Sequence, residues 1–125
     1  MEARARGWVA LAGLDGLIAV AAGAFGAHGV HDPLTANLLR TGAQYQGVHA
    51  VAALACVGLM GVAPRQARLA GWLFGVGGLV FAGSLYLLVL TGVRVLGAIT
   101  PIGGLLLMAG WAALIWGALA ESRAR

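Results

Sequence analysis

Four long runs of apolar residues alternate with short polar segments along this chain. The runs extend from Trp8 to Ala27, from Tyr45 to Val62, from Leu69 to Val93 and from Val95 to Ala120. A helix rises about 1.5 Å per residue, so roughly 20 apolar residues cross a hydrocarbon layer about 30 Å thick. All four runs meet this length, the second only narrowly, and none shows the alternating polarity of a membrane β-barrel. The pattern predicts an all-α membrane protein, one four-span domain over residues 1–125 folded as a four-transmembrane-helix bundle.

Composition and charge support a membrane location. Hydrophobic residues make up 61% of the chain and charged residues 10%, whereas about a quarter of the residues in ordinary soluble domains are charged. All eight basic residues are arginines; six fall in the two tails and the second loop, and only Arg40 and Arg94 fall in the other loops. The positive-inside rule then predicts a multi-pass inner (plasma) membrane protein with both termini in the cytoplasm. The first run is alternatively a cleaved signal peptide.

The 21 glycines recur at helical spacing, which predicts close packing between helices. Helical geometry places Gly71, Gly75, Gly78 and Ala82 on one face of the third run, and Gly103, Gly110 and Gly117 recur every seventh residue in the fourth. Small residues let helix backbones approach each other where lipid supplies no hydrophobic drive for association. We expect a tight glycine-rich bundle within one chain, with a homo-oligomer as the alternative.

The second run is preceded by a polar segment that has its own helix signals. Asp32 is suited to cap a helix and Pro33 to its first position, and the stretch from Pro33 to Gly42 is half polar. We expect a short interfacial helix here, turning near Gly42 into the span. The span itself carries a stripe of polar and soft side chains within an arc of about 100°: Tyr45, Gln46, His49, Ala53, Cys56 and Met60.

Four motifs spread over nearly the whole chain resemble one family. They are Gly23-Ala24-Phe25-Gly26-Ala27-His28-Gly29, Tyr45-Gln46 with His49-Ala50, Phe81-Ala82-Gly83-Ser84-Leu85-Tyr86, and Ile99-Thr100-Pro101-Ile102-Gly103-Gly104 followed by Gly110-Trp111. The chain is similar to the domain-of-unknown-function 423 family, which includes bacterial YwdK-like and YgdD-like inner-membrane proteins and human transmembrane protein 256. This resemblance implies a small multi-span membrane protein and implies no activity. Asp15, His31 and Asp32 depart from the family pattern.

The predicted topology gathers several polar residues at the outer face. Thr100 would cap the fourth helix and Pro101 would lie in its first turn, below the membrane surface and after a re-entrant stretch over residues 95–99. A helix amino terminus attracts anions, here a lipid phosphate or a carboxylate, with a lipid headgroup the favoured ligand. The predicted ligand-binding residues are His28, Gln46, His49, Arg94, Thr100, Gly103 and Gly104. In the alternative interpretation these residues only cap helices and anchor the interface.

Metal and haem sites are weaker alternatives for the same side chains. His28, His31 and Asp32 have the chemistry of divalent-metal ligands but no fixed fourth partner, and His28 with His49 could ligate haem from adjacent helices. Cys56 and Met60 could hold a soft metal, although a stripe of core side chains is the favoured explanation for them. We expect no cofactor and no metal, with His49 hydrogen-bonded inside the protein.

Asp15 is the most costly residue to place in a membrane span. A carboxylate there costs about 2.5–3.5 kcal/mol on insertion scales, so it should be paired, protonated or close to water. The structural interpretation has it reach the cytoplasmic interface toward Arg65 or Arg68, and the functional one makes it a proton-coupling group.

The sequence contains no nucleophile–base–acid set, phosphate loop or dinucleotide fingerprint. We therefore expect a structural or lipid-interacting membrane protein with a polar outer pocket, and do not expect an enzyme. The expected partner is membrane lipid, and the net charge of +4 gives no reason to expect nucleic acid. Three alternatives stay open: an accessory subunit of a larger membrane complex, an oligomeric small-molecule or ion transporter, and an enzyme or haem carrier.

Overall fold

The chain is all-helical, as predicted, in a computed structural model that describes residues 3–124 and the side chains of residues 3–120. A short 3-10 turn, Ala3–Ala5, leads into α1 (Arg6–His28), α2 (Pro33–Gly58), α3 (Pro64–Thr91) and α4 (Leu96–Ala124). Three helical stretches are long and apolar enough to cross a membrane: Ala3–His28, Pro64–Thr91 and Leu96–Ala120. The remaining helix, α2, is not among these three, so a fourth membrane span is not confirmed.

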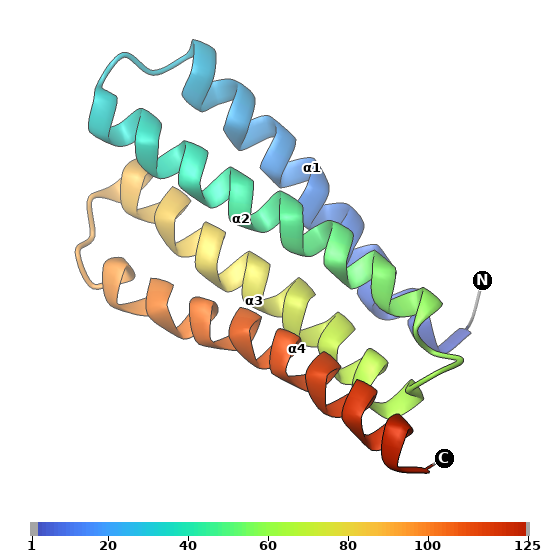
Figure 1. The fold of residues 1–125 in the computed structure, drawn as a ribbon. Coiled ribbons are helices and arrows are strands. Elements are labelled where there is room, and N and C mark those ends of the chain that lie inside the picture. The colour runs from blue at the N-terminus through green and yellow to red at the C-terminus, as the bar shows by residue number, and fades with distance from the viewer. Residues whose placement is uncertain (1–2, 125) are drawn as a thin grey trace.

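The four helices run up and down beside one another in chain order (Figure 1). The first and last described residues lie at one end, together with the loop between α2 and α3. The loops between α1 and α2 and between α3 and α4 lie at the other end, which we call the loop end. Helix α3 packs against each of the other three helices, whereas α4 packs mainly against α3. The arrangement is therefore an open layer centred on α3, and a closed four-helix bundle is not confirmed.

Apolar side chains cover the outside while small and polar side chains lie inside. Leu17, Val20 and Leu90 are each at least 70% exposed. In the interior, the Trp8 indole N–H donates to the carbonyl of Ala53 at 3.0 Å. Gly71 leaves room for that indole, because a Cβ there would lie 2.7 Å from the Trp8 ring. An apolar exterior around buried polar groups is the distribution expected of a protein solvated by lipid.

The glycines of α4 face α3. A Cβ on Gly103 would lie 2.6 Å from the Cα of Phe81, and a Cβ on Gly110 would lie 2.6 Å from Phe74 Cδ1. A Cβ on Gly117, seven residues further on, would lie 2.9 Å from the Cβ of Gln66. All three positions are too close to α3 for an added side chain, and at Gly103 the two helices approach at backbone distance.

Helix α2 is one continuous helix, so the separate interfacial helix that the sequence indicated is not confirmed. The predicted cap is confirmed, because the Asp32 carboxylate accepts hydrogen bonds from the Thr35 amide at 3.0 Å and from the Thr35 hydroxyl at 2.6 Å. The helix then passes through Gly42. Gly42 is buried against the ring of Tyr86, which gives this glycine a packing role inside a helix.

The predicted start of the last helix is wrong. Helix α4 begins at Leu96, so residues 96–99 are helical and Pro101 lies inside the helix. The Thr100 hydroxyl bonds to the Leu96 carbonyl at 3.4 Å and pairs with the Ser84 hydroxyl at 2.5 Å. The side chain therefore joins α4 to α3, and no helix amino terminus is available at residues 100–104 to attract an anion.

Candidate functional site

A chain of hydrogen bonds links α1, α2 and α3 inside the protein. The Gln46 side-chain amide donates to Asp15 Oδ1 at 2.8 Å, and the Tyr86 hydroxyl donates to Gln46 Oε1 at 2.9 Å. Asp15 and Gln46 have no exposed surface. Because the amide uses its N–H on one side and its oxygen on the other, the direction of the whole chain is fixed. We call these three residues the polar chain.

The polar chain corrects the structural interpretation of Asp15. Its carboxylate does not reach toward the cytoplasmic interface, since it is buried and bonded to Gln46. The second carboxylate oxygen, Oδ2, is buried without a hydrogen-bond partner among the residues that the structure describes. A buried polar atom left unpaired is uncommon in proteins and calls for a physical explanation.

Small residues make the space that the polar chain occupies. A Cβ on Gly42 would lie 2.7 Å from the ring of Tyr86, so a larger residue would push the phenol away from Gln46. Gly78 lies opposite Asp15, where a Cβ would approach Oδ1 at 3.5 Å, an ordinary van der Waals contact. Gly42 therefore serves the placement of a side chain, whereas an alanine would fit at position 78.

His49 forms a second polar group, one helical turn along α2 from Gln46. The Trp111 indole N–H donates to His49 Nε2 at 3.0 Å, and His49 Nδ1 lies 2.7 Å from the carbonyl oxygen of Tyr45. Because Nε2 accepts a hydrogen bond and Nδ1 faces a carbonyl oxygen, the imidazole must be the neutral tautomer that carries its proton on Nδ1. Both ring nitrogens are thus occupied, and a metal or haem iron could bind Nε2 only by displacing Trp111.

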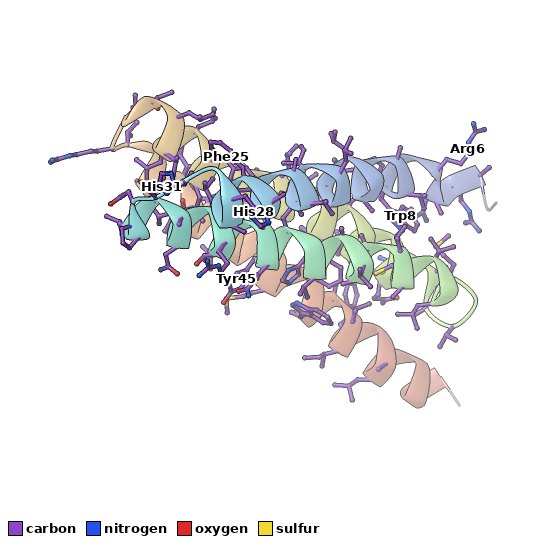
Figure 2. All side chains as sticks on the ribbon, turned by 90° about the horizontal axis from the view of Figure 1, so that it is seen from above. Arg6, Trp8, Phe25, His28, His31 and Tyr45 are labelled. Carbon is purple, nitrogen blue, oxygen red and sulfur yellow. The ribbon has the colours of Figure 1, made fainter. Side chains whose placement is uncertain are left out.

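The structure does not gather the predicted ligand-binding residues into one pocket. Gln46 belongs to the polar chain and His49 to the pair with Trp111, while Thr100 is bonded to Ser84. The side chain of His28 is exposed at the end of α1, whereas His49 is buried, so the two histidines do not share a pocket. Figure 2 shows His28 and His31 at the end of the molecule opposite Arg6.

The other predicted residues are also separate. Arg94 is exposed in the loop before α4, and Gly103 and Gly104 face Phe81. Within residues 3–120 no group of three or more His, Cys, Asp or Glu side chains is placed to hold a metal ion. Ligand binding by the seven predicted residues remains a prediction.

Sequence reasoning missed the partners on α3 and α4. Tyr86 and Trp111 stand out in the sequence only as parts of motifs, although in the structure both donate to buried side chains of α2, Tyr86 to Gln46 and Trp111 to His49. A usable signal was present, since a phenol or an indole inside an apolar span needs a hydrogen-bond partner and the polar stripe of α2 was the obvious source.

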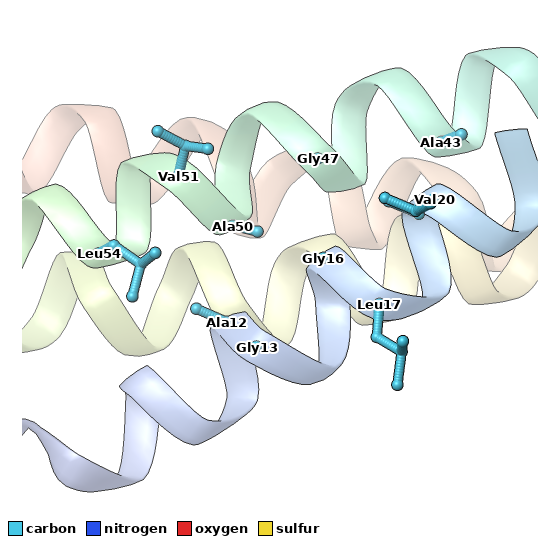
Figure 3. A pocket seen from close by; sticks show the side chains of 11 residues that line it. Ala12, Gly13, Gly16, Leu17, Val20, Ala43, Gly47, Ala50, Val51 and Leu54 are labelled. Carbon is cyan, nitrogen blue, oxygen red and sulfur yellow. The ribbon is translucent and has the colours of Figure 1, made fainter.

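Two hollows adjoin these groups. One of about 420 Å³ is lined by Gln44, Tyr45, Val48 and His49. The other, about 480 Å³, is an apolar groove between α1 and α2 (Figure 3). Gly16 and Gly47 line this groove and are next in sequence to Asp15 and Gln46.

Comparison with known proteins identifies the family. The family profile described as protein of unknown function (DUF423) matches residues 22–104. The chain belongs to this family. The matched segment includes Gln46 and Tyr86, whereas Asp15 and Trp111 lie outside it. The resemblance stated from the sequence motifs is thereby confirmed.

Curated relatives are described as membrane proteins. The UPF0382 membrane protein SSP2132 of Staphylococcus saprophyticus is 41% identical over 88% of this chain and 94% of its own length. The UPF0382 membrane protein of Haemophilus influenzae is 42% identical, with 88% and 91% covered. The UPF0382 inner membrane protein YgdD of Escherichia coli K12 is 34% identical, with 90% and 88% covered. No solved structure is significantly similar to this chain.

Proposed function

We propose that this chain is a four-span protein of the inner membrane with a structural, lipid-interacting role. The observation that carries the proposal is the sorting of side chains on α2, the helix with the weakest span signal. From residue 45 to residue 58 its outward side chains are mainly apolar, with Val48 and Val51 59% and 67% exposed, while Gln46 and His49 are buried in hydrogen bonds. In this part of α2 Gln46 and His49 are thus hidden from lipid, which is compatible with a membrane span. The exposed polar residues of α2, Asn37, Arg40 and Gln44, lie in its first half.

The orientation proposed is cytoplasmic for both termini. Arg4, Arg6, Arg65 and Arg68 lie where α1 and α3 begin, at the same end of the molecule as the last described residues, and Arg123 and Arg125 are the remaining arginines of the carboxyl tail in the sequence. A reporter fused after Arg125, which lies outside the described residues, should therefore report a cytoplasmic location. A periplasmic signal would reverse the assignment of the two ends.

Lipid contact is proposed at the loop end. His28 ends α1, Arg94 lies in the loop before α4 and Arg40 lies two turns into α2; all three are exposed, and we call them the headgroup rim. This rim takes the place of the polar outer pocket expected from the sequence, and its ligand would be the phosphate of a lipid. A basic residue near an anionic membrane surface contributes about 1 kcal/mol. Two arginines would therefore raise lipid affinity roughly 30-fold.

The rim can be tested by titrating the purified protein with phosphatidylglycerol in native mass spectrometry. The double variant Arg40→Gln/Arg94→Gln should lose roughly 30-fold in affinity. Asn37→Gln, an exposed and uncharged change near the same end, should bind as the parent does. Equal binding by all three proteins would remove the rim from the proposal.

An accessory-subunit role is the second candidate, and the exposed side of α4 favours it. This helix packs mainly against α3 and leaves Ile115, Trp116 and Leu119 at least 50% exposed. They line a hollow of about 530 Å³ that a helix of another subunit could fill. Native mass spectrometry of the protein extracted in its own lipids separates the candidates, because a stoichiometric second subunit would favour the accessory role and lipid alone would favour the structural one.

A further inference from the structure

The unpaired oxygen of Asp15 carries information about the charge of this carboxyl group. Oδ1 accepts from Gln46, and Oδ2 is buried with no partner among the described residues. The helices packed against the Asp15 carboxyl group contribute neutral groups. Gln46 comes from α2, and Gly78 and Tyr86 come from α3, with the Tyr86 phenol donating to Gln46.

No described residue supplies a counter-charge to Asp15. The nearest arginine in sequence, Arg6, is nine residues away on the same helix, about 13 Å along its axis. Arg65, one of the predicted partners, lies over the ring of Trp116 with a separation of 6.0 Å. An ionised carboxylate with one neutral donor is strongly disfavoured in an apolar interior, whereas the neutral acid is not.

We propose that Asp15 is a proton-binding site inside the helical layer, carrying its proton on Oδ2 as a neutral carboxylic acid. Gln46 and Tyr86 are positioning residues, because the fixed direction of their hydrogen bonds makes Oδ1 the acceptor and leaves Oδ2 as the atom that holds the proton. The proton stays bound while α1, α2 and α3 remain packed. Entry of water between these helices would favour the ionised form and release the proton, so proton binding is linked to the dry packing of this interior.

The protonated acid can be detected with dicyclohexylcarbodiimide, a membrane-soluble reagent. The acid proton moves to one carbodiimide nitrogen as the carboxyl oxygen adds to the central carbon, and the O-acylisourea then rearranges to a stable N-acylurea. The apolar groove between α1 and α2 (Figure 3) is lined by Gly16 and Gly47, the sequence neighbours of Asp15 and Gln46, and we expect the reagent to enter the protein there.

Asp32 provides an internal control for the labelling. Hydrogen bonds from the hydroxyl and amide of Thr35 lower the pKa of the exposed Asp32 carboxyl, so it is ionised near neutral pH. In lipid vesicles near neutral pH, peptide mass spectrometry should find Asp15 labelled at least about tenfold more than Asp32, since each pH unit between two titrations is a factor of ten. Suppression of the label by sodium ions at constant pH would show a cation site and overturn the proposal.

Infrared spectroscopy tests the proton without relying on access by a reagent. The parent should show the C=O band of a protonated carboxylic acid, shifted in deuterated water and lost in Asp15→Asn. Absence of this band near neutral pH would overturn the proposal. Gln46→Leu should shift the band because Oδ1 loses its donor, and Tyr86→Phe should shift it less, whereas the exposed control Gln44→Leu should leave it unchanged. An unshifted band in Gln46→Leu would remove the positioning role.

Discussion

Replacing Gly103 by Ala should loosen the contact between α3 and α4. A Cβ at this position would meet the backbone nitrogen of Phe81 and lie 2.6 Å from its Cα, well inside the 3.4 Å at which ordinary van der Waals contact begins. Because the obstacle is backbone, no rotamer change relieves it, and the helices must move apart by most of an ångström. A radial gap of about 0.5–1 Å already forfeits a quarter to a half of each dispersion contact.

The expected magnitude follows from two opposing effects. Overpacking of this kind costs about 1–3 kcal/mol, while alanine is favoured over glycine in a helix by about 0.8–1.0 kcal/mol. Gly83, on α3 and two residues from Phe81, serves as the matched control, because a Cβ added there would have nothing within 4 Å. The control Gly83→Ala keeps the helix preference without the collision, so the two variants should differ by about 1–3 kcal/mol.

Reversible unfolding in mixed detergent micelles, followed by far-ultraviolet circular dichroism, measures this difference. We expect Gly83→Ala to unfold at the same or a higher denaturing-detergent fraction than the parent, and Gly103→Ala at a lower fraction than Gly83→Ala. If both variants shift equally, α3 and α4 do not meet at backbone distance and the packing described above is incorrect.

Three further changes test other parts of the fold. Gly75→Leu should destabilise the protein in the same unfolding assay, because a Cβ at that position already lies 2.6 Å from Leu11 Cδ2; unfolding like the parent would mean that this face is open. Gln46→Leu should cost about 1–3 kcal/mol for each buried partner it leaves unpaired, whereas Gln44→Leu, at an exposed position, should cost little, and equal effects would contradict the polar chain. The pKa of Asp32 is lowered in the folded protein, so its ionised cap should stabilise the fold fully above about pH 4, and this stabilisation should be lost as pH falls through the lowered pKa. The variant Asp32→Asn keeps a capping side chain, and its thermal unfolding should lack that pH dependence.

The sequence by itself determined the helices and the character of their surfaces. Long apolar runs leave the backbone no solvent to bond with, so each must satisfy its hydrogen bonds internally as a helix. The cap at Asp32 was equally predictable, because it depends only on residues three positions apart. The seven-residue recurrence of Gly103, Gly110 and Gly117 also indicated the face of α4 that meets α3.

The points at which helices begin were harder to predict from the sequence, because local signals favoured other starts. Thr100 and Pro101 are residue types that often begin a helix, yet α4 begins at Leu96 and contains Pro101 in its second turn. The Thr100 hydroxyl is instead used by Ser84 on α3. Likewise the polar content of residues 33–42 indicated a separate helix, although packing against Tyr86 keeps Gly42 inside α2.

Only the tertiary structure decided the partners of the polar groups. Asp15 pairs with Gln46, 31 residues away, and His49 with Trp111, 62 residues away. Such pairs depend on the rotation and axial register of each helix against its neighbours, and helical periodicity specifies a face but not the residue opposite it. The sequence could show that Asp15 needed a partner, while the choice of a neutral amide over an arginine, and the oxygen left unpaired by that choice, arose from packing.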